Sequence, residues 1–403
     1  MSIANISWAE LCALSANRPI YAFGRSEEWI EKLQRQVDLQ GIFDSNIQRC
    51  VDYNALPTIH KQRIQEFKAL NPYLVITCSA VFEISEFLQA EGFTPGLDFT
   101  VLPDIRDALS INRLNTPDGK FLFTTSDHED NSQRGSTIKG GVFLGEYKAG
   151  RFEFHRKYAG SMRELACDGL RYFAVDGVNQ KLAIFDFDLN LTNEIELPHA
   201  NCCGVGITAE KIVIANSSRD SLLIFDLDSF SFLGEVFISP LSGAEALSRL
   251  HINDICIIPD GRILVSMFSK TGLWRSGVMD GGVCVLDENM KIVDYMIGNL
   301  QQPHTPRLID GEVFVANSFA GQILRNSDEV ILESDGFLRG IAPLDEFLLV
   351  GQSQPLYLER KLKKKLATNV TAGFYILDTR VSAYSFWPLA GVKNIHSIMA
   401  LKS

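Results

Sequence analysis

Paired apolar runs, each introduced by a charged or polar residue, recur along the chain after residue 105, where helical periodicity ends. The first members of the pairs are KFLFTTS (120–126), RYFAVDG (171–177), KIVIANS (211–217), RILVSMF (262–268), EVFVANS (312–318) and EFLLVGQ (346–352). The second members are KGGVFLG (139–145), QKLAIFD (180–186), DSLLIFD (220–226), DGGVCVLD (280–287), AGQILRN (320–326) and AGFYILD (372–378). Runs of this length are typical of β-strands, so the six pairs predict six repeats of a strand unit.

Two neighbouring pairs keep a constant spacing. Arg171 and Lys211 are 40 residues apart, and so are Asp186 and Asp226. Strand repeats of roughly 40–50 residues are typical of a β-propeller with one four-stranded blade per repeat. The last segment, 391–403, offers one strand without a second, and we expect it to complete the first blade and join the two ends of the repeat region.

The first hundred residues have a different pattern. Short apolar runs alternate there with helical patterns, as in PIYAFG (19–24), SEEWIEKLQRQ (26–36) and YLVITCS (73–79). This order is typical of a parallel sheet covered by helices. The sequence therefore predicts a mainly β fold, with a small Rossmann-like α/β domain over residues 1–105 and a six-bladed β-propeller over residues 106–403.

Polar residues gather at the starts of the predicted innermost strands. Because the first strand of each propeller blade lies next to the central axis, these residues should converge on one axial funnel. They are Arg163, Glu164, His199, Asn201, His251, Asn253, Asp254, His304, Arg307, Arg339 and His396. Any one of them could instead bond a neighbouring blade. Arginines, histidines and a carboxylate in one cavity are nevertheless costly unless a ligand compensates them.

Two kinds of chemistry fit this set. In the first, His251 and His304 transfer protons as catalytic residues. The substrate is then held by Glu164, Asn253, Arg307, Arg339 and His396, since guanidinium groups bind carboxylate, phosphate or sulfate. In the second, the imidazoles of His251, His304 and His396 hold a divalent transition metal. The sequence leaves both open.

Composition and charge narrow the class of partner. Hydrophobic residues make up 46% and charged residues 22% of the chain, the balance of a folded globular protein. The net charge of −11 argues against nucleic acid or an anionic membrane, and the basic cluster Arg360 to Lys365 is short. Eight cysteines without a CxxC spacing predict a reducing compartment. With no secretion signal or apolar run of membrane-spanning length, we expect a cytoplasmic protein.

The motifs PHTPRLIDGEVFVANS, LHINDICIIPDG, GFLRGIAP and GGVCVLDE resemble those of a family of bacterial proteins of unknown function, DUF4915. The resemblance covers roughly residues 160–403 and falls on His251, Asn253, His304, Arg307 and Arg339. Two features depart from the family pattern: Thr305 stands where serine is usual, and NIHSIM replaces an acidic ending, so His396 is particular to this chain. The resemblance supports the fold and the choice of residues, and implies no reaction.

The N-terminal segment is similar to the small Rossmann-like domains that precede sugar-modifying enzymes. YAFGRSEEW (21–29) keeps only Gly24 of a glycine-rich phosphate loop, which argues against a nucleotide cofactor. Asp44 nevertheless lies about 20 residues further on, where an acidic group could bind a ribose hydroxyl. The alternative is a degenerate module that docks a protein partner or forms a homo-oligomer.

Two functions therefore remain open. One is an enzyme, a lyase, epimerase or hydrolase, whose funnel binds a small anionic molecule such as a sugar derivative or a carboxylated metabolite. The other is a non-catalytic binding or scaffold propeller that recruits a partner protein.

Overall fold

The computed structural model describes residues 6–126, 139–148, 150–238, 249–354 and 370–401. The chain divides into two compact units. The first comprises residues 1–116 with the segment Asp378–Tyr384, and the second comprises Pro117–Leu377 with Ser385–Ser403. The basic cluster at 360–365 lies outside the described residues.

The first unit is a small α/β domain built on a parallel sheet, as the alternating pattern predicts. Its strands lie in the order β3-β2-β1-β4-β5, and every neighbouring pair is parallel. The strands are β1 (Ile20–Phe23), β2 (Leu39–Asp44), β3 (Thr58–His60), β4 (Tyr73–Ile76) and β5 (Phe99–Val101). The helices are α1 (Trp8–Ser15), α2 (Glu27–Gln34), α3 (Ile64–Phe67), α4 (Val81–Ala90) and α5 (Pro103–Leu114).

The second unit confirms the predicted six-bladed β-propeller, since six four-stranded sheets are formed. The strands of the first three blades are β29 (Ile398–Ala400), β6 (Gly119–Thr125), β7 (Gly141–Lys148) and β8 (Arg151–Ala159); β9 (Met162–Cys167), β10 (Tyr172–Asp176), β11 (Lys181–Phe185) and β12 (Leu191–Glu196); β13 (Cys202–Ile207), β14 (Lys211–Asn216), β15 (Ser221–Asp226) and β16 (Phe232–Phe237). Those of the last three are β17 (Ile252–Ile257), β18 (Ile263–Met267), β19 (Gly281–Leu286) and β20 (Ile292–Leu300); β21 (Pro303–Ile309), β22 (Glu312–Asn317), β23 (Gln322–Arg325) and β24 (Glu329–Glu333); β25 (Phe337–Leu344), β26 (Phe347–Ser353), β27 (Gly373–Asp378) and β28 (Ala383–Pro388).

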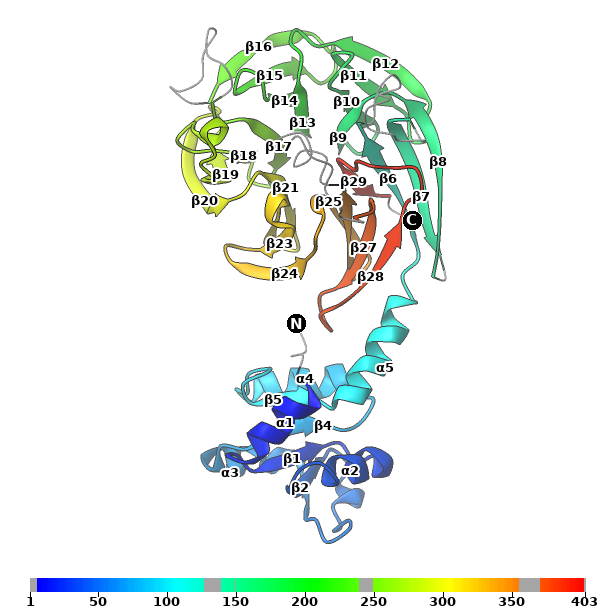
Figure 1. Ribbon diagram of the computed structural model, residues 1–403, viewed down its shortest axis with the longest axis vertical. Coiled ribbons are helices and arrows are strands. Elements are labelled where there is room, and N and C mark those ends of the chain that lie inside the picture. Colours follow the sequence, from blue (N-terminus) through cyan, green and yellow to red (C-terminus); the bar gives the residue numbers. More distant parts are fainter. Residues whose placement is uncertain (1–5, 127–138, 149, 239–248, 355–369, 402–403) are drawn as a thin grey trace. The chain divides into compact units, whose positions relative to one another are not determined.

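The ring is closed by strands from opposite ends of the repeat region. β29 pairs antiparallel with β6, with Ile398 opposite Phe123. Figure 1 shows β9, β13, β17, β21, β25 and β29 as the innermost strands around the centre of the ring. Residues that are far apart in the sequence therefore meet at this centre.

The apolar core of the propeller lies between adjacent blades. Phe173 and Val175 of β10 pack in one cluster with Ile212 and Ile214 of β14. Each fully buried side chain of this size contributes roughly 1.5–3 kcal/mol. The apolar residues of the strands thus place one face of each blade against the neighbouring blade. This packing fixes the inner strands around the axis.

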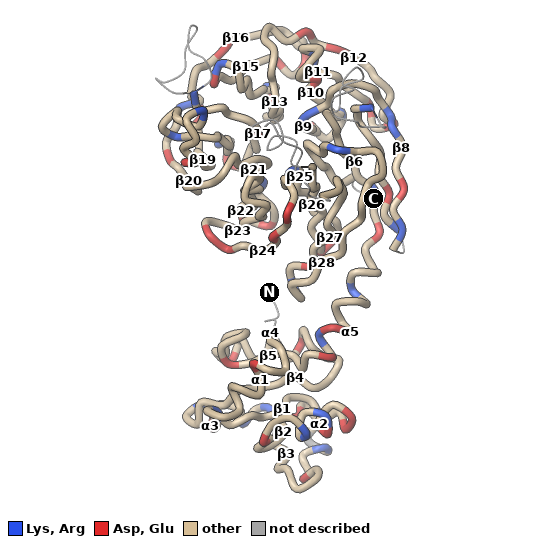
Figure 2. The backbone as a smooth tube through the Cα atoms, viewed as in Figure 1, with Lys and Arg blue, Asp and Glu red and all other residues tan. Residues whose placement is uncertain are grey.

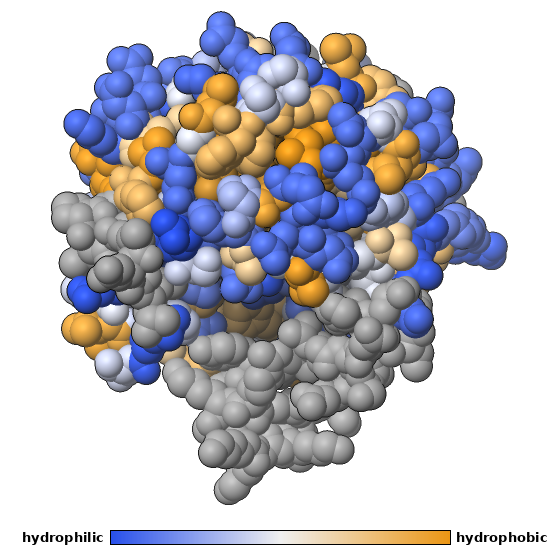
Figure 3. All heavy atoms as spheres, turned by 90° about the horizontal axis from the view of Figure 1, so that it is seen from above, coloured by the Kyte–Doolittle hydropathy of each residue, from blue (hydrophilic) through white to orange (hydrophobic). Residues whose placement is uncertain are grey.

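The outer strands carry a mixed surface. Figure 2 shows acidic and basic positions interspersed along them. Phe232 and Leu233 of β16 and Val293 and Tyr295 of β20 are exposed, and Figure 3 shows hydrophobic areas lying among hydrophilic ones on one face. Over the described residues, no helix combines the length and the apolar character needed to cross a membrane.

Candidate functional site

A cavity of about 540 Å³ lies on the propeller axis and draws residues from all six blades. The cavity lies at the starts of the inner strands, where the sequence predicts that polar residues converge. Representative lining residues, one for each blade, are Ser126, Arg163, Cys203, Asn253, His304 and Arg339. Of the other residues predicted to converge on the axis, Asn201, His251, Asp254 and His396 also line it.

The described lining residues carry more positive than negative charge. Arg163, Arg275 and Arg339 contribute three guanidinium groups, whereas Asp254 contributes the one carboxyl group. Arg163 donates a hydrogen bond from Nη1 to the sulfur of Cys203, which also accepts from the Ser217 hydroxyl at 3.0 Å. The cavity is therefore cationic in a chain whose net charge is −11.

Arg339 is held beside His396 at the wall of the cavity. Its Nη1 donates to Nε2 of His396 at 2.9 Å, and its guanidinium lies 4.7 Å from the ring centre of Phe337. An arginine can donate only, so this contact requires a neutral imidazole nitrogen as acceptor. The predicted pair of Arg339 and His396 is thus brought together, with the imidazole orienting the guanidinium.

His304 is buried, with 3% of its surface exposed, and its orientation is fixed by hydrogen bonds. Its Nδ1 lies 2.9 Å from the Gln302 carbonyl and 2.9 Å from the Ser318 hydroxyl. A carbonyl accepts only, so Nδ1 carries the ring proton in that bond and Nε2 is left as an acceptor. Burial, followed by the charge of Arg339, lowers the pKa of His304 well below its ordinary value.

His251 packs among aromatic rings at the same wall. Its ring centre lies 4.3 Å from that of Phe268 and 4.7 Å from that of Trp274. Burial, with the nearby charges of Arg163, Arg275 and Arg339, lowers the pKa of His251 to about 3. Both imidazoles predicted to be catalytic are therefore neutral at neutral pH.

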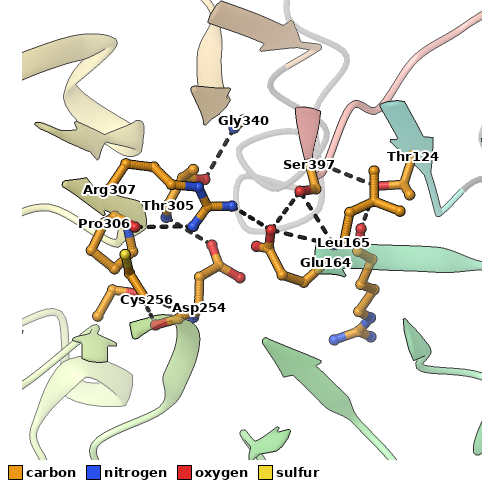
Figure 4. Close-up of polar contacts among 12 residues, drawn as sticks. Thr124, Glu164, Leu165, Asp254, Cys256, Thr305, Pro306, Arg307, Gly340 and Ser397 are labelled. Carbon is orange, nitrogen blue, oxygen red and sulfur yellow. Dashed lines mark hydrogen bonds and ion pairs between the residues drawn. The ribbon is translucent and has the colours of Figure 1, made fainter. Parts of the chain in front are cut away.

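The structure places Arg307 and Glu164 elsewhere than the sequence analysis predicts. Neither lines the cavity; Arg307 instead donates from Nη2 to Glu164 Oε1 at 2.5 Å, and Glu164 is only 1% exposed (Figure 4). The physical reason is that the inner strands run along the axis. The register of β21 against β22 shifts between the two residues, since His304 pairs with Ala316 and Arg307 with Phe314. At a rise of about 3.3 Å per residue of β22, Arg307 therefore lies roughly 7 Å further along the strand than His304.

Asp254 lines the cavity beside that ion pair. Its Oδ2 accepts a hydrogen bond from the Thr305 backbone N–H at 2.8 Å. Burial, followed by the negative charge of Glu164, raises the pKa of Asp254 to about 7, against the opposing effect of that N–H and of Arg339 and Arg307. The Asp254 carboxyl group therefore keeps its proton to a higher pH than an ordinary aspartate does.

The predicted metal set finds no support in the donor groups. His251, His304 and His396 all line the cavity, but within the described part of the chain no three His, Cys, Asp or Glu residues are grouped so as to hold a metal ion. His251 packs on aromatic rings, and His396 accepts from Arg339. These contacts direct the imidazoles to different partners, not to one point.

Two further predicted residues lie outside the axial cavity. His199 contacts Glu235, with 3.3 Å between Nε2 and Oε2. Asp44, at the end of β2, borders a cavity of about 360 Å³ in the α/β domain. Its two oxygens accept from the backbone N–H groups of Arg25 and Asn46, so they hold the local loop. A role of Asp44 in binding a ribose stays a prediction.

Sequence reasoning missed Arg275 and Cys203. Arg275 belongs to a short 3-10 helix, Trp274–Ser276, between β18 and β19, and lies outside the repeated strands from which candidates were chosen. The sequence feature that could have pointed to Arg275 is an arginine next to a tryptophan in the segment between two strands. Cys203 is the second residue of an inner strand, but its chemistry depends on contact with Arg163, 40 residues away in the chain.

Comparisons with known proteins give one family and distant structural similarities. A family model described as a domain of unknown function (DUF4915) matches residues 200–401, half of the chain. Curated proteins give no match. A chain of a nidogen/laminin complex is 10% identical with a TM-score of 0.50, covering 70% of this chain and 98% of that one. A protein of unknown function from Bacteroides caccae is 12% identical with a TM-score of 0.47, covering 71% of this chain and 100% of that one.

Proposed function

We propose a function for this chain, which belongs to the DUF4915 family, from the geometry of its axial cavity: it binds a small polar anion and acts on it by acid–base chemistry. The ligand class is a sugar derivative or another carboxylated metabolite. A lyase, an epimerase and a hydrolase all use such chemistry, and the cavity favours none of them over the others.

The observation that carries the proposal is the concentration of guanidinium groups. Arg163, Arg275 and Arg339 come from three different parts of the ring and line one cavity with a single carboxyl group. Like charges held together cost free energy, and an anion that accepts from their N–H groups relieves this cost. The planar donors of arginine match the two oxygens of a carboxylate or phosphate.

The neutral imidazoles complement this anion site. Nε2 of His304 is an acceptor, so it can take a hydrogen bond from a ligand hydroxyl or N–H group. A bound anion favours the imidazolium form and raises the pKa of His251 and His304 from its low value in the empty cavity. Ligand binding thereby prepares each ring to accept a proton, which is the role proposed for them.

The proposal is tested with two anions of simple chemistry, gluconate and sulfate, by isothermal titration calorimetry. Arg275→Ala and Arg339→Gln each remove one charge-assisted contact, worth about 1.5–3 kcal/mol, and should weaken binding roughly tenfold or more. Arg325→Ala is the matched control, because Arg325 pairs with Glu329 on the outer strands. Equal affinities in all three variants would overturn the anion site.

The scaffold alternative has an observation of its own. Phe232 and Leu233 on β16, with Val293 and Tyr295 on β20, leave apolar surface exposed on outer strands. A scaffold that uses this surface would keep its partner when His304 and Arg339 are replaced by alanine, whereas anion binding would be lost with the same changes. Replacing Phe232 and Leu233 by serine should have the opposite effects.

Metal analysis of the purified protein tests the remaining alternative, a metal site formed by His251, His304 and His396. A stoichiometric transition metal that is lost in a His304→Ala variant would support the metal-binding hypothesis. The contacts of His251 and His396 provide no shared point of coordination, so we expect the metal content to be unaffected by that change.

A further inference from the structure

Two carboxyl groups meet on the axis below the anion site. Glu164 comes from β9 and Asp254 from β17, which belong to blades that are not neighbours. Figure 4 shows the two side chains pointing toward one another, with the guanidinium of Arg307 beside them. Acidic side chains rarely approach each other in a protein interior, because two buried negative charges repel strongly.

The strand between the two blades makes room for this approach. Gly204 of β13 lies against the backbone of β17, and a Cβ atom at Gly204 would come within 2.6 Å of the Asn253 carbonyl and 2.9 Å of the Asp254 Cα. A residue with a Cβ atom at this position would collide with the backbone of β17 and force the two strands apart. The glycine thus lets the Asp254 side chain reach toward Glu164.

The hydrogen bonds of Glu164 are divided unequally between its two oxygens. Oε1 accepts from Arg307 Nη2, from the Ser397 hydroxyl at 2.5 Å and from the Leu165 N–H at 3.3 Å. Oε2 is buried and has no hydrogen-bond partner. Leaving such an acceptor unsatisfied costs about 1–3 kcal/mol, and more for a charged group. A donor on the facing group would remove that cost.

Asp254 is the group that can supply the donor. Arg307 contacts Glu164 directly and compensates its charge, whereas Asp254 accepts a backbone N–H from Thr305. The charged groups around Asp254 are Glu164 and Arg163 from β9, Arg307 from β21 and Arg339 from β25. A protonated Asp254 carboxyl provides an O–H for Oε2 and relieves the repulsion at the same time.

We propose that Asp254 and Glu164 hold one proton between them, and that this proton, exposed to the cavity through Asp254, couples anion binding to pH and serves as the acid of the site. The inference rests on the proposed anion site for its function. Asp254 lines the cavity and Glu164 does not, so a ligand exchanges protons with Asp254. In that step the Asp254 O–H bond breaks, a new bond to hydrogen forms on the ligand, and the carboxylate left behind faces Arg339 and Arg307.

The sign of the coupling follows from the charge in the cavity. Below the raised pKa of Asp254, about 7, its carboxyl group is neutral and three guanidinium groups face the anion. Above it, a negative charge is added next to the ligand. Gluconate and sulfate keep a constant charge in this range, so their affinity should rise by up to about tenfold in total as the pH falls from about 8 to about 6.

The first experiment measures the carboxyl group itself. In protein labelled with ¹³C at aspartate carboxyl carbons, we expect one signal that titrates near pH 7 and is absent from Asp254→Asn. Glu164→Gln should lower that apparent pKa by about one unit or more, because the neighbouring charge is removed. Glu235→Gln, on β16, is the control and should leave it unchanged. A wild-type protein in which no aspartate titrates above about pH 5 would overturn the shared proton.

The second experiment measures the coupling. Calorimetric titrations of gluconate across the same range should show the rise in affinity for wild type and a flat profile for Asp254→Asn, which keeps the size of the side chain. A profile that stays pH-dependent in this variant would refute the role of Asp254. If the aspartate titrates near pH 7 but gluconate and sulfate do not bind wild type, the proposed anion site fails and the shared proton stands, so the two failures are distinguishable.

Discussion

At the scale of single residues, the buried imidazoles of the cavity make stability depend on pH. The pKa of His251 falls from 6.5 to about 3 on folding. Below pH 6.5 the unfolded chain therefore binds a proton that the folded chain does not, and stability decreases as the pH falls from about 6.5 toward 3. At pH 5 this amounts to about 2 kcal/mol.

The effect of His251 is isolated by comparing variants. Asp254 acts in the opposite direction, since its raised pKa gives stability that is lost as the pH rises from 3.8 to about 7. His251→Phe suits the aromatic surroundings of the ring and leaves Asp254 in place. Urea unfolding at pH 7 and pH 5 should show this variant gaining about 2 kcal/mol relative to wild type at the lower pH. His155→Gln, at an exposed position, should behave as wild type.

Gly204 provides a second test at this scale. A Cβ atom there would meet backbone atoms of β17, including the Ile255 nitrogen at 2.8 Å. At Gly206, two residues along, the nearest atoms would instead belong to the side chains of Ile257 and Ile255. We expect Gly204→Ala to destabilise the propeller by about 1–3 kcal/mol and to weaken the pH dependence of anion binding. Gly206→Ala should cost less, because a side chain can rotate away. Equal losses in urea unfolding would contradict the close approach at Gly204.

At the scale of elements, the sequence was sufficient to identify the strands. It was not sufficient to tell how far along the propeller axis each residue of an inner strand lies. Repeated apolar pairs identified six blades, and the polar strand starts correctly placed His251, His304, Arg339 and His396 on one cavity. No pattern in the sequence states where the cavity ends. Arg307 was therefore assigned to the ligand, although the same inner strand carries it past the cavity to Glu164.

Functional residues in loops could not be predicted from the repeats, for a related reason. Arg275 lies in the connection between β18 and β19, outside the paired strands on which the repeats are aligned, so that alignment cannot locate it. Asp254 was identified at a strand start but not chosen for the site, because its raised pKa arises from burial and from the charge of Glu164, 90 positions earlier in the chain. Contacts of this kind are set by ring closure and are invisible to local patterns.

The closing strand is the element whose loss should matter most. Ile398 on β29 is 2% exposed and pairs with β6, and the adjacent Ser397 bonds Glu164. Ile398→Ala should cost about 2–5 kcal/mol, because it removes buried apolar contact at the only pairing that joins the ends of the described ring. Val330→Ala, at an exposed position on β24, is the control and should cost well under half of that. Thermal unfolding of both variants measures the difference.

At the scale of the whole molecule, two electric fields act on an approaching anion. The chain as a whole carries a net charge of −11 and repels it from a distance, while the arginines of the cavity attract it at close range. Salt affects the long-range field first: the Debye length falls from about 30 Å at 0.01 M to about 8 Å at 0.15 M. The effects of the two fields should therefore be distinguishable in the salt dependence of the association and dissociation rates.

We expect the association rate of gluconate to increase with salt as repulsion is screened, and the dissociation rate to increase because the local attraction weakens as well. Trp274 packs against His251 at the cavity and offers a fluorescence signal for stopped-flow measurement. Arg275→Ala should raise the dissociation rate without reversing the salt trend of association. An association rate that decreases with salt would mean that the field of the arginines extends beyond the cavity and outweighs the net charge of the chain.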